Sequence, residues 1–549
     1  MIADQIYVNG KFYTSDEDCP AAEAVAVKAG KFLAVGSNEE IELLSGSGTQ
    51  RFDLQGRFVL PGLVDAHTHI GLSAMMGDDD DVPMYDCKSK EEVLETLRRE
   101  VRKHPLRPYY VMFFGQAEAL EPGGLRKEEI DAVVRHRPVV LMEYECHSAW
   151  LNSGALRFLK IREDSPDIAP GCSVYERDEE GRLTGCIKEM CLLPILDLSG
   201  NLSRKALRRG MQKLVNYLLS CGVTTVYDAG SFLHEEKVYQ VLKEMDEEGD
   251  LPLRFEATHI INLPTLLPGA IEEFKRLKSL YETDHIRFNT MKMMLDGTLR
   301  IHTARQVSPY NDTGTWGGTL IPEEDLCQFI RALNQEKIDF HVHTVGEGAV
   351  KMVMDCVERL RNEIGGPLDI FVTAAHIETL RDEDISRFKE LGIVADFTPS
   401  WHGGCCHTDP EHMTRLLGAY RGTHTLRAKS VVDTGALVTF SSDEVSLHEM
   451  DRWNPFLGME VGHTRQEVKD GGKDAPVYPP IMERLALQDL IRGYTITPAR
   501  VLRLDDRMGS ITPGKDADMV VLRQDLFEMD PYEIHNVVPE WVVLRGRWA

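Results

Sequence analysis

Two histidines in the segment Asp65-Ala66-His67-Thr68-His69 are the first residues whose types and spacing could support chemistry. They end an apolar run at 63–67 that we interpret as a buried β-strand. Because alternate residues of a strand point to the same side, both imidazoles would project together and could bind one divalent metal ion. A His-x-His pair is a weak signal alone, and its position at a strand end strengthens it.

Further metal-binding residue types lie at the ends of later apolar runs. His343 lies in the run at 340–344, His376 ends the run at 371–376, and Asp443 follows the run at 438–442. Ligands so distant in sequence can meet only if these strand ends share one rim, as they do in a parallel barrel. The recurrence favours a metal site over isolated core histidines. His341 is either an outer partner of the ligands or a core residue.

A lysine, Lys292, lies within the otherwise apolar run at 290–295. A charged ammonium group would be costly to bury there, so the side chain needs a partner or a different chemical form. One interpretation is that its neutral amine captures carbon dioxide and becomes a carbamate, an anionic ligand able to bridge two cations. The alternative is a lysine paired with a carboxylate such as Asp296.

This set of residue types predicts hydrolysis of an amide-type bond. Two divalent cations would lower the pKa of a bound water toward neutrality and would polarise a substrate carbonyl. Asp443 could take the proton from that water and deliver it to the departing nitrogen.

The elements that would position these residues are βα units in a closed parallel barrel. Eight apolar runs predict its strands, at 63–67, 224–228, 253–259, 290–295, 340–344, 371–376, 393–398 and 438–442. Ser203 is expected to cap the helix that precedes the second strand. Residues from about 72 to 202 exceed one βα unit, with apolar runs at 109–114 and 139–144 and a helical pattern at 90–103. We interpret them as an insertion after the first strand that shapes the substrate pocket.

Both chain ends contain short β-type runs. Asn9-Gly10 and Ala29-Gly30 lie between such runs and predict hairpins, since both positions of a two-residue turn need positive φ. Similar runs recur at 518–522 and near 537–544. We therefore expect a β-sandwich domain formed by 1–61 and 505–549, around a barrel domain spanning 62–504.

The composition is that of an ordinary folded chain, 42% hydrophobic and 27% charged over 549 residues. Its formal net charge of −26 disfavours nucleic acid and anionic membranes as partners and favours a small neutral or cationic substrate. The first residues lack a signal-peptide pattern, and no run approaches the roughly 18 apolar residues of a membrane span. A cytoplasmic location is therefore expected.

The eleven cysteines are scattered, so most are expected to be reduced, buried thiols. Cys405-Cys406-His407 could bind metal, although a loop with unpaired cysteines is the simpler interpretation. The acidic run at 78–81 could attract a cation, and a solvated turn is again simpler.

Taken in order along the chain, several motifs resemble those of the amidohydrolase superfamily. Leu60-Pro61-Gly62-Leu63-Val64-Asp65-Ala66-His67-Thr68-His69 resembles its opening signature, and Gly509-Ser510-Ile511-Thr512-Pro513-Gly514-Lys515-Asp516-Ala517-Asp518 resembles its closing motif. The segments His147-Ser148-Ala149-Trp150-Leu151-Asn152-Ser153, 291–297, His343-Thr344-Val345-Gly346-Glu347 and Ser441-Ser442-Asp443 are similar to family 3, the branch that includes N-substituted formamide deformylases.

The resemblance implies a distorted (β/α)8 TIM barrel with a discontinuous β-sandwich, and a metal-dependent hydrolase acting on carbon–nitrogen bonds. It implies a metal site formed by His67, His69, Lys292 as a carboxylated bridge, His343, His376 and Asp443, with Asp443 also as the catalytic acid/base. Candidate substrate-binding residues are His147, Asn152, Glu189, Arg300 and His302. Arg300 and His302 are bulkier than the residues usual at those positions, and Glu347, Ala374 and Ala375 also depart from the family pattern, which indicates an altered substrate preference.

Two other functions stay open on the residues alone. One is a deaminase of a cyclic amidine that uses one metal ion and no carbamate, and the other is a non-catalytic assembly protein, although such relatives typically lose ligands that this chain keeps. We expect one or two divalent metal ions per chain, with zinc the first candidate and manganese, cobalt and iron also suited to these ligands. A homodimer is one option for the assembly.

Overall fold

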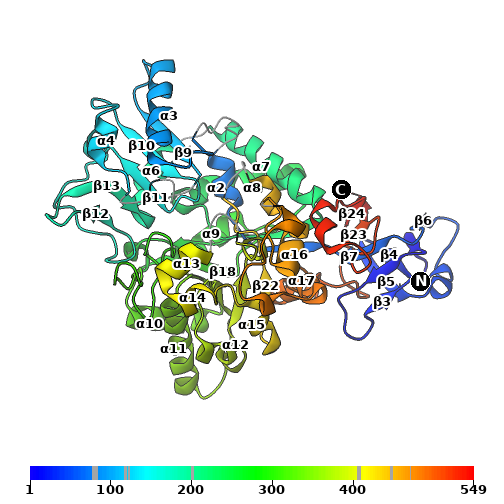
Figure 1. Ribbon diagram of the computed structural model, residues 1–549. Helices are drawn as coiled ribbons and strands as arrows, with labels where there is room; N and C mark the ends of the chain where they lie inside the picture. The colour runs from blue at the N-terminus through cyan, green and yellow to red at the C-terminus, as the bar shows by residue number, and fades with distance from the viewer. Residues whose placement is uncertain are drawn as a thin grey trace.

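The computed structural model describes residues 1–76, 84–115, 120, 124–199, 203–404, 410–445, 449–469 and 471–548. The segments at 78–81 and 405–407, for which cation binding was considered, lie outside the described residues. Strands from both chain ends form one end of the molecule, the barrel occupies the centre, and the segment after the first barrel strand forms the opposite end (Figure 1).

The eight predicted runs supply the strands of a parallel barrel. In chain order these strands are β8 (Leu63–Thr68), β14 (Val223–Asp228), β15 (Arg254–Glu256) with β16 (Ile260–Ile261), β18 (Thr290–Met294), β19 (Asp339–Thr344), β20 (Val372–His376), β21 (Val394–Phe397) and β22 (Val438–Phe440). They belong to two sheets, ordered β17-β15-β14-β8 and β16-β18-β19-β20-β21-β22, where β17 is Ile286–Arg287. The third strand is interrupted after Glu256, and Thr258 Oγ1 donates to Thr290 O at 2.8 Å beside the break. The barrel is therefore distorted.

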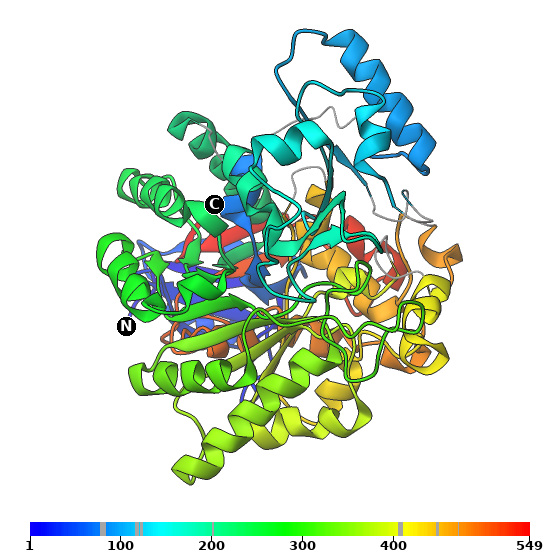
Figure 2. The same ribbon diagram turned by 90° about the vertical axis from the view of Figure 1, so that its left-hand side faces the viewer.

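Helices cover the outside of the barrel (Figure 2). Every residue of β8, β14, β18, β19 and β20 is buried, which explains why these strands are continuous apolar runs rather than alternating ones. Ser203 caps α7 as predicted, because its side chain accepts a hydrogen bond from Ala206 N. The helices that follow barrel strands, or precede the next one, are α7 (Arg204–Ser220), α8 (Glu235–Glu248), α9 (Ala270–Tyr281), α10 (Glu323–Glu336), α11 (Glu347–Ile364), α12 (Ile385–Leu391), α15 (Ala428–Asp433), α17 (Leu487–Gly493) and α18 (Ile496–Val501).

The insertion after β8 contains a five-stranded sheet of its own, ordered β12-β13-β11-β10-β9. Its strands are β9 (Tyr110–Phe114), β10 (Val139–Glu143), β11 (Ser148–Leu151), β12 (Tyr175–Arg177) and β13 (Leu183–Lys188), and its helices are α3 (Lys90–Lys103), α4 (Lys127–Asp131), α5 (Ser153–Phe158) and α6 (Leu193–Ser199). The predicted helix at 90–103 coincides with α3. Met190 and Leu193 pack in one apolar cluster with Ile260 and Met294 of the barrel. The insertion therefore lies against the carboxyl ends of barrel strands.

Strands from both chain ends share one sheet, ordered β25-β24-β23-β7-β2-β3, and a second sheet is ordered β5-β4-β1-β6. These strands are β1 (Gln5–Val8), β2 (Lys11–Tyr13), β3 (Ala21–Ala22), β4 (Ala24–Lys28), β5 (Lys31–Gly36), β6 (Gln50–Asp53), β7 (Phe58–Pro61), β23 (Met519–Leu522), β24 (Trp541–Leu544) and β25 (Arg547–Trp548). The remaining helices are α1 (Asn38–Glu42), α2 (Ile70–Met76), α13 (Pro410–Leu417), α14 (Ala419–Gly422) and α16 (Pro455–Thr464). The domain limits 1–61, 505–549 and 62–504 stay a prediction.

One of the two predicted hairpins is wrong. Ala29 and Gly30, at φ of 50° and 77°, do join the antiparallel strands β4 and β5. At Asn9-Gly10, however, β1 pairs with β4 and β6, whereas β2 pairs with β3 and β7, so the chain passes from one sheet into the other. Only Asn9 of this pair has a positive φ, at 58°, whereas a two-residue hairpin turn of this type needs it at both positions.

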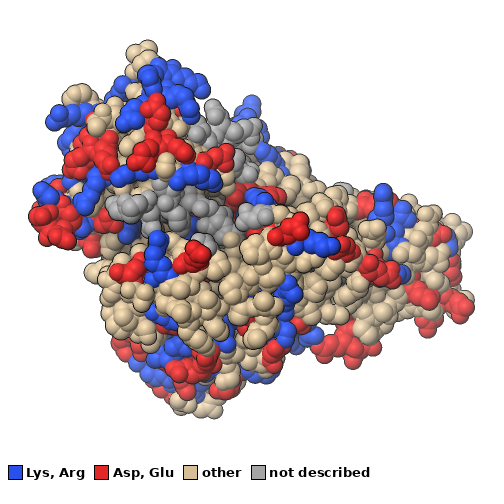
Figure 3. Space-filling model, in the orientation of Figure 1, with Lys and Arg blue, Asp and Glu red and all other residues tan. Residues whose placement is uncertain are grey.

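A disulfide between Cys327 and Cys356, whose Cα atoms lie 4.9 Å apart, links α10 and α11. This pair departs from the expectation of reduced cysteines. Among the described residues, no helix combines the length and the apolar character needed to cross a membrane. Acidic and basic side chains are interspersed over the face of the molecule shown in Figure 3.

A buried ion-pair cluster joins the barrel to the C-terminal segment. Arg254 of β15 donates Nη2–H to Asp516 Oδ2 at 2.6 Å and Nη1–H to Asp518. These three residues are 4–5% exposed. Asp518 also accepts a hydrogen bond from Arg545 N at 2.8 Å. The motif at the end of the chain is therefore attached to the barrel by charge, whereas its strand β23 pairs with β7 and β24 of the terminal sheet.

Replacing Arg254 by alanine should destabilise the protein strongly, because it leaves the buried Asp518 carboxylate without its cation and leaves Asp516 paired only with Lys31 and Arg507. We expect a loss of about 3–5 kcal/mol in the free energy of unfolding, measured by urea denaturation. The control is Arg51→Ala, which removes an exposed pair with Glu42 and should change the same quantity by less than about 1 kcal/mol. Equal losses in both variants would contradict the proposed role of the Arg254 cluster.

Candidate metal centre

His67, at the end of β8, is the most connected residue of the site. Its Nε2 lies 3.0 Å from Lys292 Nζ and 3.2 Å from Asp443 Oδ1. Its Nδ1 lies 3.0 Å from His341 Nε2 and 3.5 Å from Asp396 Oδ2. The imidazole of His67 therefore contacts predicted ligands through Nε2 and two further buried residues, His341 and Asp396, through Nδ1. His341 is thus placed as an outer partner of the ligands.

Asp443 contacts three of the predicted histidines. Besides His67, its Oδ1 lies 3.6 Å from His69 Nε2, and its Oδ2 lies 3.3 Å from His376 Nδ1. Asp443 adopts a left-handed conformation with φ of 48°, and His376 does so with φ of 74°. Such conformations in residues other than glycine persist where the surroundings enforce them, and they cluster at functional sites.

Asp65 provides the constraint that holds Asp443 in place. Its carboxylate accepts hydrogen bonds from Ser442 Oγ at 2.6 Å and Ser442 N at 3.0 Å. Asp443 N in turn donates to His67 O at 2.9 Å. These bonds join the end of β22 to β8, where the described strands form no continuous ladder.

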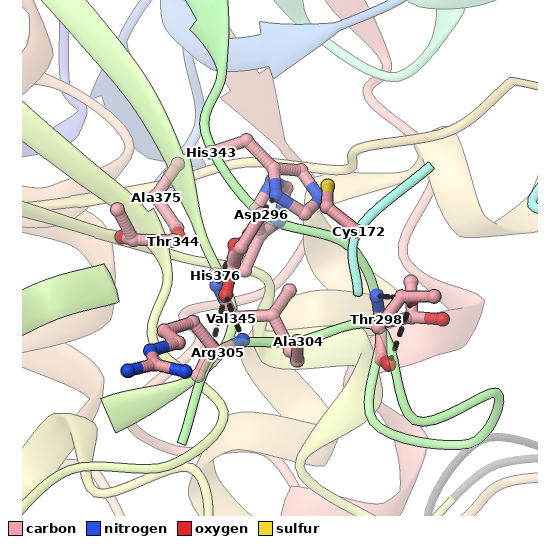
Figure 4. A network of polar contacts seen from close by, with 12 residues as sticks. Cys172, Asp296, Thr298, Ala304, Arg305, His343, Thr344, Val345, Ala375 and His376 are labelled. Atoms are coloured by element: carbon pink, nitrogen blue, oxygen red, sulfur yellow. Dashed lines mark hydrogen bonds and ion pairs between the residues drawn. The ribbon is translucent and has the colours of Figure 1, made fainter. Parts of the chain in front are cut away.

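The carboxylate of Asp296 orients the ring of His343 (Figure 4). Asp296 Oδ1 lies 3.1 Å from His343 Nδ1 and accepts from Val345 N at 3.0 Å, while Oδ2 accepts from Gly346 N at 2.9 Å and Arg305 N at 3.0 Å. With Nδ1–H directed to the carboxylate, His343 keeps its Nε2 lone pair for a metal ion. Asp296 is therefore not the carboxylate that pairs with Lys292, because these four contacts occupy it, whereas the charges of Asp443 and Asp396 do act on Lys292.

The other two imidazoles are also held in defined positions. His69 Nδ1 lies 2.9 Å from Gly230 O, which leaves its Nε2 lone pair facing Asp443. The ring of His376 stacks on Trp401 with centroids 5.8 Å apart and lies 4.4 Å from the ring of His343. Its Nε2 is buried and has no hydrogen-bond partner among the described residues. A buried nitrogen in this state is suited to an additional ligand.

Burial dominates the electrostatics of the site. It lowers the pKa of Lys292 to about 7, although Asp443 and Asp396 act in the opposite direction. It raises the pKa of Asp443 to about 7, against the effect of Lys292. Burial followed by the Lys292 charge lowers the pKa of His69 to about 3. The histidines are therefore neutral, the form in which imidazole binds metal.

The structure brings all six predicted ligands together. The candidate ligand atoms of His67, His69 and Asp443 lie within 4.8 Å of one another. Neutral imidazoles, a carboxylate and an amine that can become a carbamate form a donor set suited to zinc and similar divalent ions. The residues present therefore fit a divalent metal centre.

A cavity opens onto this cluster, and three of the five candidate substrate-binding residues line it. It is lined by His69, His343, His376 and Asp443, by His147, Glu189 and Arg300, and by apolar residues that include Leu72, Met190, Leu193 and Phe232. Although burial acts in the opposite direction, Glu189 raises the pKa of His147 to about 9.

Asn152 and His302 do not line the cavity. Asn152 caps α5, and its amide donates to Val134 O at 2.6 Å and Arg137 O at 2.8 Å, so it supports the insertion itself. His302 lies 3.0 Å from Asp312. Both side chains therefore lie outside this cavity lining, and their contact with substrate stays a prediction.

Sequence reasoning missed Asp396, Gly230 and the role of Asp296. Asp396 lies within the predicted strand at 393–398, and a carboxylate inside a buried strand was a signal that could have identified it. Gly230 acts through its carbonyl, for which the sequence carries no signal.

Comparison with known proteins agrees with this geometry. Residues 50–549 match the family model described as "Amidohydrolase family". The chain belongs to this amidohydrolase family. The family assignment and the barrel with its β-sandwich confirm the family and the fold that the motifs predicted.

Three proteins illustrate how far the similarity extends. The amidohydrolase is 25% identical to the putative amidohydrolase YtcJ of Bacillus subtilis over 99% of this chain and 98% of that protein. It is 24% identical to the N-substituted formamide deformylase of Arthrobacter pascens over 96% and 94% of the two chains. An uncharacterized metal-dependent hydrolase from Pyrococcus horikoshii superposes with a TM-score of 0.68 at 22% identity, over 96% of this chain and 99% of the other.

Replacing Asp296 by asparagine should weaken metal binding, because the change removes the carboxylate that orients His343. We expect the dissociation constant for zinc to rise about 10–100-fold, measured by titration of the chelator-treated protein. Asp312→Asn is the matched control, since it alters a His–Asp pair that does not line the cavity, and it should leave the constant unchanged. Tight zinc binding by Asp296→Asn would show that Asp296 is not needed to orient a ligand.

Proposed function

We propose that this amidohydrolase hydrolyses the carbon–nitrogen bond of a small N-acyl or N-formyl compound. The residues that would hold a divalent metal, with zinc as first candidate, are His67, His69, Lys292 as a carbamate, His343, His376 and Asp443. The observation that carries the proposal is the Asp443 carboxylate, which lies within 3.2–3.6 Å of nitrogens from three histidines and lines the cavity.

Lys292 supports a centre with two metal ions. It is fully buried, and its amine lies 3.0 Å from His67 Nε2. In the carbamate reaction the neutral amine nitrogen bonds to the carbon of carbon dioxide and releases one proton, so a neutral amine becomes an anionic carbamate among the candidate metal ligands. When bound, divalent ions supply Lewis acidity, which polarises the carbonyl and lowers the pKa of water.

The side chains of the site would transfer the protons and position the reacting groups. Asp443 takes the proton from the attacking water and delivers it to the nitrogen as the carbon–nitrogen bond breaks. The net reaction consumes one water and yields a carboxylic acid and an amine. Asp65 and Ser442 hold the carboxylate at the rim, and Asp296 and Gly230 O keep His343 and His69 in the required tautomer.

The cavity, lined by apolar side chains and a few polar ones beside the candidate ligands, favours a small molecule as the partner. On the face seen in Figure 3, outside its grey atoms, acidic and basic side chains alternate without a continuous basic surface. The net charge of −26 is also unfavourable for a nucleic acid or an anionic membrane. A homodimer stays compatible with this proposal.

Substitution of Asp443 tests the proposed chemistry. A library of N-acyl and N-formyl amines should contain substrates for the wild-type protein, and Asp443→Asn should lower kcat on them by about 10²–10⁴-fold, because asparagine cannot accept the proton. Asp451→Asn, at an exposed carboxylate near Lys469, should retain wild-type kcat. Equal turnover by the wild type and Asp443→Asn would exclude Asp443 as acid/base.

Metal counting separates the proposal from the deaminase alternative. Elemental analysis should give about two divalent ions per chain, because a carbamate on Lys292 can bridge them. Lys292→Ala should bind about one ion fewer, and native mass spectrometry of the wild type should show the added mass of one carbon dioxide. About one ion per chain with no added mass would favour a mononuclear deaminase.

A further inference from the structure

The insertion contributes an ion pair to the cavity lining, and neither of its residues is among the six proposed metal ligands. His147 Nδ1 lies 2.8 Å from Glu189 Oε2, and both residues line the cavity. Glu189 is 2% exposed, whereas the side chain of His147 is 22% exposed. The carboxylate is thus the buried anchor, and the imidazole is the part that reaches the accessible space.

Glu189 is held by the barrel as well as by the insertion. Its Oε1 accepts from Thr303 Oγ1 at 2.7 Å and from Thr298 N at 3.2 Å, both in the segment that follows β18. A Cβ atom on Gly297 would overlap Glu189 Oε1 and Thr303 Oγ1, so glycine leaves the space that this carboxylate occupies. Glu189 also adopts a left-handed conformation with φ of 54°. The two hydrogen bonds, the space left at Gly297 and the backbone conformation together fix the Glu189 carboxylate beside the His147 imidazole.

With Nδ1–H bound to Glu189, the remaining nitrogen of His147 is its Nε2. The ring centroid of His147 lies 6.2 Å from that of His343, on the wall it shares with His69 and Asp443. A carbonyl group placed in the cavity beside Asp443 would therefore also lie close to His147. A charge-assisted donor at this place would stabilise negative charge that develops on the carbonyl oxygen.

We propose that His147 is a catalytic residue that donates its Nε2–H to the oxygen of the scissile carbonyl, and that Glu189 is the positioning residue behind it. The inference rests on the proposed amide hydrolysis. As the water oxygen bonds to the carbonyl carbon, the π electrons move to the oxygen, and His147 hydrogen-bonds to it without transferring its proton. When the carbon–nitrogen bond breaks, the electron pair returns from the oxygen and the nitrogen leaves with the proton from Asp443.

The same wall indicates the chemical class of the substrate. Met190 and Leu193 follow Glu189 closely in sequence and line the cavity, together with Leu72 and Phe232. Groups of this kind bind hydrocarbon, so the amide should carry an apolar substituent, which the probes below place on the amide nitrogen. N-Formylphenethylamine and N-acetylphenethylamine are suitable probes.

The test compares His147→Ala and His147→Gln with a matched pair elsewhere. His535 Nδ1 lies 2.7 Å from Glu460 Oε2, with side chains 26% and 1% exposed, and this pair lies outside the cavity lining. His147→Ala should lower kcat/KM on the active probe about 10²–10³-fold, and His147→Gln, which keeps an N–H donor, should lose less. His535→Gln should behave as the wild type. Wild-type kcat/KM in His147→Ala would overturn the proposal.

A binding measurement tests the donor without turnover. Phenethyl methylphosphonate carries an anionic tetrahedral group and an apolar arm, and its Kd should rise about 10–100-fold in His147→Ala, with metal content and unfolding temperature measured alongside. For Glu189→Gln we expect a weaker Kd and a lower kcat with little change in KM, because the imidazole loses its orientation. Equal phosphonate affinity in the wild type and His147→Ala would contradict the proposed donor.

The two proposals can fail separately. If the wild type hydrolyses no amide in the library, the proposed function fails, while the phosphonate comparison still decides whether His147 binds an anionic oxygen. If the wild type is active and both His147 variants match it, only the role of His147 fails.

Discussion

Closure of the barrel between its last and first strands is the constraint on which the site depends. Asp65 binds the backbone and hydroxyl of Ser442, 377 positions later in the chain, and Asp443 N donates to His67 O. These bonds place the Asp443 carboxylate against His67 and His69. Without that closure the ligands from the two edges of the barrel would not share one centre.

Burial is the second constraint, because it disfavours the charged forms of the ionisable side chains in the site. Lys292 and Asp443 both shift toward a pKa of about 7, and the neighbouring imidazoles are kept neutral. Such a cluster contributes little to stability in the absence of a cation. Its arrangement is understandable as a preformed set of donors, oriented from outside by Asp296 and by the Gly230 carbonyl.

The insertion and the barrel divide the site between them. Barrel strands carry the proposed metal ligands on rigid elements, whereas the insertion contributes His147, Glu189 and the apolar wall. Their junction is the Gly297 to Thr303 segment, where the barrel receives a carboxylate from the insertion. The barrel thus holds the proposed metal ligands, while the insertion supplies the apolar wall and the proposed His147 donor, which is coupled to the barrel through Glu189.

The sequence by itself determined the barrel strands and the ligand types, because burial on both faces produces continuous apolar runs with polar residues at their ends. It also determined α3 and the cap at Ser203, which depend on local periodicity. Only the tertiary structure decided that Asn9-Gly10 joins two sheets and that Asp296 orients His343 rather than pairing with Lys292. Those outcomes depend on contacts between residues far apart in the chain, which local spacing does not encode.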